Sequence, residues 1–197
     1  MKSVRSKAGA HSSPKSSKRL RKSSRVPFEM RLKRVRLFLC DVDGVLTDGA
    51  VTMGGETETK RFHIQDGLGL RLLQREGIRV GWISNRPSFA TTQRALDLKV
   101  DFLHQKDGNK VEAAERILSE AGLDWESVCY MGDDVVDLGV LKRAGTAVVP
   151  ANGIDEAKRA AHYVTRAHGG YGAVREVVDL ILKAQGKWPK LIEFFSR

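Results

Sequence analysis

Short apolar runs alternate along this chain with longer stretches in which apolar residues recur at helical spacing. The apolar runs are bounded by Gly, Pro, Asn or Asp, which is typical of buried strands. We expect strands at residues 35–40, 80–84, 101–104, 128–131, 146–149 and 163–165. We expect helices at residues 70–76, 88–98, 110–121, 135–144, 155–161 and 173–185. This alternation predicts an α/β fold with a mostly parallel sheet covered by helices on both faces.

Residues 51–64 depart from that alternation, because two runs flank the pair Gly54-Gly55. Two short runs around a glycine pair predict a β-hairpin. The hairpin would form a small flap inserted after the first strand, and it is too short to be a separate cap domain.

The positive charge of the chain is concentrated near its first residues. The first 36 residues hold 13 of the 34 Lys and Arg but only one of the 24 acidic residues. Such a segment cannot bury enough surface to offset chain entropy, so we expect residues 1–34 to form a disordered basic tail. It could be a transit-like leader, a polybasic arm that contacts RNA or anionic lipid, or sequence ahead of a true start at Met30. We favour a dispensable tail over nucleic acid or membrane contact.

The cysteine content and the lack of long apolar runs indicate the cellular compartment of the protein. Cys40 and Cys129 lie near the ends of expected buried strands, where cysteine acts as a small apolar residue, and we expect no disulfide. No apolar run approaches the ~18 residues that a membrane span requires. We therefore expect a cytoplasmic protein.

Four carboxylates follow two of the expected strands. Asp41 and Asp43 follow the first strand, and Asp133 and Asp134 follow the fourth. In a doubly wound sheet of order 3-2-1-4-5 these strands are neighbours at the switch point, so the acids would meet in one crevice. Hard oxygen ligands without His or Cys suit Mg²⁺. The alternative is that Asp133 and Asp134 only cap the following helix; the acids on the adjacent strand favour the metal.

The run Asp41-Val42-Asp43-Gly44-Val45-Leu46-Thr47-Asp48-Gly49 resembles the first motif of the haloacid dehalogenase (HAD) phosphatases. It is most similar to the 3-deoxy-D-manno-octulosonate 8-phosphate (KDO 8-phosphate) phosphatases and their sialic-acid-type relatives. The resemblance extends over residues 36–185. It implies a doubly wound Rossmann-like HAD core at residues 35–186, Mg²⁺-dependent hydrolysis of a sugar-acid phosphate, and a homotetramer. In such a tetramer the C-terminal tail, residues 187–197, would lie near a neighbour's site.

The resemblance also assigns roles to particular residues. It makes Asp41 the nucleophile and a metal ligand, and Asp43 the acid and base whose backbone carbonyl binds the metal. Ser84 would hydrogen-bond the phosphoryl oxygens, and Asp133 would bind Mg²⁺. Lys110 would neutralise the phosphoryl charge, with Lys106 as its rival. The residues expected to contact substrate or support the site are Thr47, Asp66, Asn85, Arg86, Asp134 and Asp137.

Two departures from the family pattern concern the substrate. The family reads Thr-Gly-Arg where this chain has Ser84-Asn85-Arg86, and it has an arginine where this chain has Tyr171. The substrate could therefore be a different small phosphosugar or a sialic-acid-type 9-phosphate. One alternative is a non-enzymatic HAD-like binding domain anchored by the basic tail, which the presence of Asp41, Asp43, Ser84, Lys110 and Asp133 disfavours. Another is a receiver-type regulatory domain, which the Gly132-Asp133-Asp134 turn and the hairpin disfavour.

Overall fold

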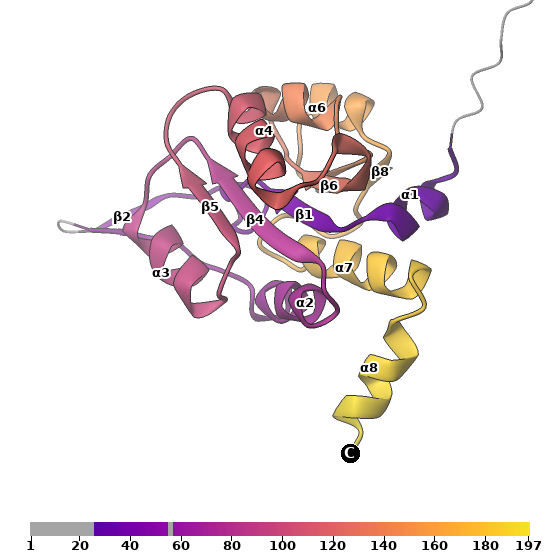
Figure 1. The fold of residues 1–197 in the computed structure, drawn as a ribbon. Coiled ribbons are helices and arrows are strands. Elements are labelled where there is room, and N and C mark those ends of the chain that lie inside the picture. Colours follow the sequence, from indigo (N-terminus) through magenta and orange to yellow (C-terminus); the bar gives the residue numbers. More distant parts are fainter. Residues whose placement is uncertain (1–25, 55–56) are drawn as a thin grey trace, which may run out of the picture.

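A six-stranded parallel sheet forms the centre of the computed structural model, which describes residues 26–54 and 57–197 (Figure 1). The strand order is β5-β4-β1-β6-β7-β8. The strands are β1 (Leu37–Cys40), β4 (Arg79–Ser84), β5 (Phe102–Gln105), β6 (Val128–Met131), β7 (Thr146–Val149) and β8 (Tyr163–Val164). Strands β1 and β6 are neighbours, as the predicted order requires, so the acids that follow them meet at one edge of the sheet.

Helices cover both faces of the sheet. Figure 1 shows α4 (Lys110–Ala121) and α6 (Asp155–Ala160) on one face, and α2 (Ile64–Arg75) and α7 (Ala173–Ala184) on the other. Helix α3 (Phe89–Asp97) lies near the β5 edge, and the short α5 (Leu138–Leu141) packs with α4 and α6. The doubly wound α/β fold predicted from the sequence is confirmed.

Strand β1 shows why the apolar runs are continuous. Leu37 and Leu39 pack with α4 and α5, whereas Phe38 and Cys40 pack with α2 and α7. Successive side chains of a strand point to opposite faces, and both faces here are covered, so every position must be apolar. Cys40 and Cys129 are buried free thiols, as expected.

Several predicted boundaries were wrong. Helix α2 begins at Ile64, six residues before the predicted start, so Asp66 and Gly67 are helical. The segment predicted as one helix at 135–144 is a 3₁₀ turn, Val135–Asp137, followed by α5. The turn forms because the side chains of Asp134 and Asp137 bond to each other's backbone N–H groups in a capping box.

Two terminal segments also differ from the prediction. Residues Phe28–Arg34 form α1, which buries Leu32 in the core, so the expected tail of residues 1–34 extends too far. Helix α8 (Trp188–Phe195) buries Leu191 in the core of its own chain, so this part of residues 187–197 packs on its own domain and not only near a neighbour's site. Residues 1–25 lie outside the described residues. None of the described helices is long and apolar enough to cross a bilayer.

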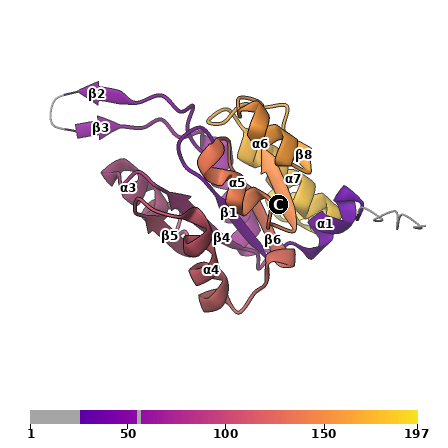
Figure 2. The ribbon, with the colours of Figure 1, turned by 90° about the horizontal axis from the view of Figure 1, so that it is seen from above.

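The hairpin predicted after the first strand is present. Strands β2 (Thr52–Gly54) and β3 (Thr57–Thr59) pair antiparallel, and they project from the body of the molecule (Figure 2). Strand β3 is shorter than predicted, because the chain leaves the hairpin after Thr59 and enters α2 at Ile64. The residues that lead out of the hairpin return to the sheet edge where the acids lie.

Candidate active site

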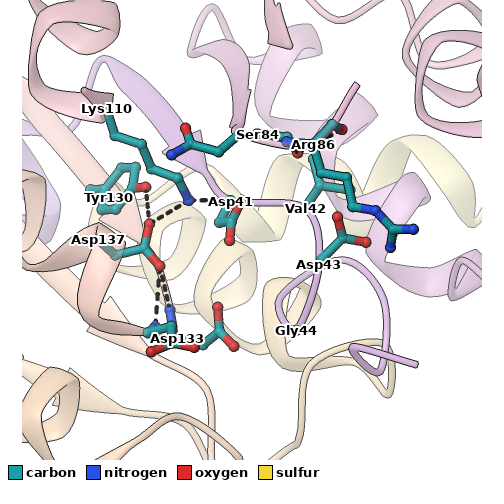
Figure 3. A network of polar contacts seen from close by, with 12 residues as sticks. Asp41, Val42, Asp43, Gly44, Ser84, Arg86, Lys110, Tyr130, Asp133 and Asp137 are labelled. Atoms are coloured by element: carbon teal, nitrogen blue, oxygen red, sulfur yellow. Dashed lines mark hydrogen bonds and ion pairs between the residues drawn. The ribbon is translucent and has the colours of Figure 1, made fainter. Parts of the chain in front are cut away.

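Asp41 and Asp43 leave the end of β1 in different directions. Asp41 points toward Lys110, whereas Asp43 lies on the other side of the loop near Arg86 (Figure 3). The carbonyl of Val42 accepts backbone N–H groups from Val45, Leu46 and Thr47, so the chain turns sharply between the strand and Gly44. The two carboxylates therefore have separate surroundings and can do different chemistry.

Lys110 is held between two carboxylates at the N-terminus of α4. Its Nζ lies 2.9 Å from Asp41 Oδ1 and 2.8 Å from Asp137 Oδ1, and its side chain is only 2% exposed. Tyr130 also donates to Asp137 Oδ1, at 2.6 Å. The rival lysine, Lys106, is exposed on the loop before α4. The structure thus brings Lys110, and not Lys106, to Asp41.

Asp137 organises the loop that carries Asp133. Its Oδ2 accepts the backbone N–H groups of Asp133, at 2.9 Å, and of Asp134, at 3.2 Å. Asp133 Oδ1 is buried without a hydrogen-bond partner among the described residues. A Cβ placed on Gly44, whose φ is +89°, would lie 2.1 Å from Asp133 Oδ2. Asp133 therefore fills the space beside the Asp43–Gly44 loop with one oxygen unsatisfied.

The charge balance of this cluster is unfavourable without a cation. Burial raises the pKa of Asp41 to about 6, although Lys110 opposes the rise. Burial, followed by repulsion from Asp41 and Asp137, raises the pKa of Asp133 to about 7. Burial works to lower the pKa of Lys110, but Asp41 and Asp137 together outweigh it and the pKa is raised. One buried lysine cannot neutralise three carboxylates.

The cluster fits a hard divalent cation. Oxygens of Asp41, Asp133 and Asp137 lie within 4.8 Å of one another, and Asp133 offers an unpartnered oxygen. Carboxylate oxygens alone are the donor set that Mg²⁺ prefers. Both oxygens of Asp137 are already bonded to protein donors, so Asp41 and Asp133 are the side chains available to the ion. Asp137 instead supports them.

Asp43 is paired with a lysine that sequence reasoning missed. Lys60 Nζ lies 2.8 Å from Asp43 Oδ1 and 2.9 Å from Oδ2, and the Lys60 side chain is 1% exposed. Glu58, on the same edge of the hairpin, pairs with Lys60 at 3.5 Å and with Arg86 at 2.6 Å. The alternation Glu58-Thr59-Lys60 was the available signal, since it places both charges on one face of the strand.

Ser84 and Asn85 lie at the end of β4, the other neighbour of β1. Ser84 is buried, and its Oγ accepts the backbone N–H of Arg86 at 3.1 Å. Asn85 Nδ2 donates to the carbonyl of Gly108 at 3.0 Å, which ties this turn to the loop before Lys110. Figure 3 shows Ser84 and Asp41 at the same end of the sheet; the phosphoryl contact of Ser84 stays a prediction.

Three predicted residues support the backbone. Thr47 Oγ1 accepts the N–H groups of Gly44 and Gly49 and so closes the loop that carries Asp43. Asp66 accepts the N–H groups of Gly172 and Arg175 at the start of α7. Asp134 caps the turn before α5 by accepting the N–H of Val135. The contacts of Asp134 are therefore those of a helix cap, the alternative to metal binding that the sequence left open for this residue.

Asn152, in the loop between β7 and α6, links the Asp43 loop to the loop before α7, and sequence reasoning missed this contact. Asn152 donates to the carbonyl of Gly44 at 2.9 Å and accepts the N–H of Gly169 at 2.6 Å. A Cβ on Gly169 would lie 1.8 Å from the Gly44 carbonyl oxygen, so glycine is required there. The signal for Asn152 is weak, since an Asn-Gly pair after a strand also predicts an ordinary turn.

Comparison with known proteins gives a consistent result. A profile of the haloacid dehalogenase-like hydrolases matches residues 99–177. The 3-deoxy-D-manno-octulosonate 8-phosphate phosphatase KdsC of Yersinia pestis is 41% identical over 158 residues, 80% of this chain and 84% of that protein. KdsC of Escherichia coli (strain K12) is 39% identical over the same shares. The Moraxella catarrhalis phosphatase of the same name, solved with a magnesium ion, a phosphate ion and KDO, superposes with a TM-score of 0.83 at 37% identity over 85% of this chain and 97% of that one.

Proposed function

This chain belongs to the 3-deoxy-D-manno-octulosonate 8-phosphate phosphatase family of the haloacid dehalogenase-like hydrolases, and we propose that it hydrolyses KDO 8-phosphate. The observation that carries the proposal is the pairing of buried Asp41 with Lys110 at the edge where Asp133 and Ser84 also converge. The reaction is hydrolysis of a phosphomonoester that proceeds through an aspartyl-phosphate on Asp41.

Asp41 and Asp133 would hold Mg²⁺, together with the backbone carbonyl of Asp43. The ion, when bound, supplies positive charge to a phosphoryl group and keeps the Asp41 carboxylate ionised. The unpartnered oxygen of Asp133 and the excess of acids over cations support this assignment. Asp137 keeps Asp133 in place by accepting its backbone N–H.

Asp41 is the nucleophile in the first half of the reaction. One of its carboxylate oxygens forms a bond to phosphorus while the bond from phosphorus to the sugar oxygen breaks. Lys110 neutralises charge on the transferring group, and Ser84 donates a hydrogen bond to it. Phosphoryl transfer depends mainly on such positioning and charge neutralisation.

Asp43 handles the protons in both halves of the reaction. It gives a proton to the departing sugar oxygen, and it then takes a proton from the water that attacks the aspartyl-phosphate. This second step releases inorganic phosphate and regenerates the Asp41 carboxylate. The separation of Asp43 from the Lys110 cluster supports this division of work, because the two carboxylates face different partners.

Assembly into a homotetramer in the cytoplasm is a further part of the proposal. Apolar side chains are exposed near the hairpin, where Ile64 is 74% and Phe89 is 78% exposed, and on α8, where Phe195 is 60% exposed. Surfaces of this kind favour contact with another protein. Light scattering on the purified chain tests the assembly, and a fully active monomer would rule it out.

A substrate panel tests the proposed function. Release of inorganic phosphate should be fastest from KDO 8-phosphate, should require Mg²⁺, and should vanish after addition of a chelator. Faster turnover of a sialic-acid-type 9-phosphate or of a neutral phosphosugar would reassign the substrate, which Tyr171 makes a specific alternative. Absence of phosphate release from every ester would favour a binding domain.

A further inference from the structure

The segment that leaves the hairpin carries two cations in succession, Lys60 and Arg61, which contact different parts of the Asp41–Gly49 loop. The buried side chain of Lys60 contacts Asp43, and the exposed side chain of Arg61 contacts Asp48 and also Tyr171. In extended chain, successive side chains point in opposite directions, so one short segment can bind two sets of partners.

We propose that Lys60 is a positioning residue for the Asp43 carboxylate and that Arg61 fixes the hairpin stem from which Lys60 acts. The inference rests on the proposed function, in which Asp43 is the proton donor. Lys60 would hold the Asp43 carboxyl group in the orientation from which it gives its proton to the oxygen of the leaving group.

The contacts of Lys60 restrain the orientation of the Asp43 carboxylate. Its ammonium lies nearly equidistant from the two oxygens, at 2.8 and 2.9 Å. An ammonium shared by both oxygens opposes rotation of the carboxylate, whereas a contact to one oxygen would leave the other free to move. The Lys60 side chain is 1% exposed and the Asp43 side chain is 25% exposed, so the ammonium is shielded from bulk water while the carboxylate stays open to a substrate.

The contacts of Arg61 hold the stem at two points. Its guanidinium lies 2.6 Å from Asp48 Oδ2, and it bonds to the Tyr171 hydroxyl while lying 4.8 Å from the centre of the Tyr171 ring. Asp48 belongs to the loop after β1, and Tyr171 belongs to the loop before α7. A two-stranded hairpin is marginal alone, so these contacts add to the support that β3 gains from the pair of Glu58 with Arg86.

The leaving group distinguishes this role from a purely structural one. A sugar alkoxide needs a proton from Asp43 as the ester bond breaks, whereas p-nitrophenolate is stable enough to leave without one. The ratio of kcat/KM for KDO 8-phosphate to kcat/KM for p-nitrophenyl phosphate therefore measures how effectively Asp43 protonates the leaving oxygen. Because kcat/KM reports steps up to phosphoryl transfer, the later water attack does not enter the ratio.

The variants for this test are Lys60→Met, Lys60→Arg and Arg61→Gln. Lys33→Met is the matched control, because Lys33 is an exposed lysine in α1 whose partner is Glu29. We expect Lys60→Met to lower the ratio by on the order of 10²-fold, within the usual contribution of an acid. Arg61→Gln should lower the ratio less. Lys60→Arg, which keeps the positive charge, should retain much of the wild-type ratio, and Lys33→Met should leave the ratio unchanged.

Other outcomes overturn the inference. An equal loss on both esters would show that Lys60 supports the fold, and a rise in KM alone would make it a substrate contact. If Lys60→Met does not fold, an unchanged ratio in Arg61→Gln would still contradict the inference. Failure of the wild-type enzyme to hydrolyse either ester would instead refute the proposed function, so the two failures are distinguishable.

Discussion

Asp41 and Asp43 stand two residues apart, yet each is ion-paired with a different lysine: Asp41 with Lys110 at 2.9 Å and Asp43 with Lys60 at 2.8 Å. The turn at Val42–Gly44 produces this separation, because the chain leaves the strand and no longer keeps the two side chains on one face. One motif can thus supply a nucleophile from a metal-binding cluster and a proton carrier from a separate ion pair.

The choice between the two lysines can be tested by paired substitutions. Lys110→Met should abolish most activity and lower the free energy of unfolding by about 3–5 kcal/mol, since it leaves Asp41 and Asp137 as uncompensated buried charges. Lys106→Met should change neither, because Lys106 is exposed. Phosphate release and urea unfolding measure both effects, and loss of activity in the Lys106 variant alone would reverse the assignment.

The pKa values of Asp41 and Asp133 predict how metal and pH act on stability. Both carboxyl groups titrate higher in the folded chain, with pKa values of about 6 and about 7, than the 3.8 of an unperturbed aspartate. Folding therefore loses stability as pH rises from about 4 to about 7, and a carboxyl pKa that is higher by one in the folded chain costs about 1.4 kcal/mol. Mg²⁺ should remove this penalty, so it should raise Tm more at pH 8 than at pH 5.5.

Thermal melts with and without Mg²⁺ at these two pH values provide the measurement. Asp133→Asn is the companion variant, and its Tm should respond to Mg²⁺ much less at pH 8. An equal Mg²⁺ response of the wild type at both pH values would mean that the ion does not bind to the ionised forms of these acids.

Gly169 should tolerate no side chain. In Gly169→Ala the new Cβ would meet the Gly44 carbonyl oxygen, so the loop that carries Asp43 must shift. A misplacement of about 1 Å can cost on the order of 10² in rate, and we expect a loss of this size in kcat. His168→Ala, at an exposed neighbouring position, should be near wild type. A fully active Gly169→Ala enzyme would show that the close approach is not needed.

The boundary between the tail and the folded domain can be located by stability. Deleting residues 1–25 should leave Tm and turnover near wild type, because their composition offers little to pack. Leu32→Ala should lower the free energy of unfolding by about 2–5 kcal/mol, because Leu32 is 3% exposed in the core. A destabilising deletion together with a neutral Leu32→Ala would place the boundary before residue 26.

Much of the site follows from local signals in the sequence. Asp41 and Asp133 end apolar runs, and the alternation of runs with helices places such ends together at the sheet edge. Lys110 opens a strongly periodic helix whose N-cap, Asn109, is of a favoured residue type. The positions of these three residues depend on their neighbours in sequence and on the order of the strands. The alternation of apolar runs with helical stretches predicts both.

The remainder depends on contacts that no local pattern encodes. The contact of Lys60 with Asp43 spans 17 residues and requires the hairpin to fold back on the loop. Helices α1 and α8 are short, and they are helical because Leu32 and Leu191 find places in the core. Asn152 reaches Gly44 across 108 residues of chain.

The most direct test of the central claim is to locate the phosphoryl group on the enzyme. Asp43→Asn should slow breakdown of the covalent intermediate, because the attacking water loses its base. Because p-nitrophenolate leaves without a proton from Asp43, we would mix this variant with p-nitrophenyl phosphate labelled in the phosphate, quench the reaction with acid, and map the labelled peptide by mass spectrometry. Asp41→Asn is the control, and deamidation must be excluded by mass. The account predicts label on Asp41 and none in the control; label on another residue, or turnover without a labelled enzyme, would contradict it.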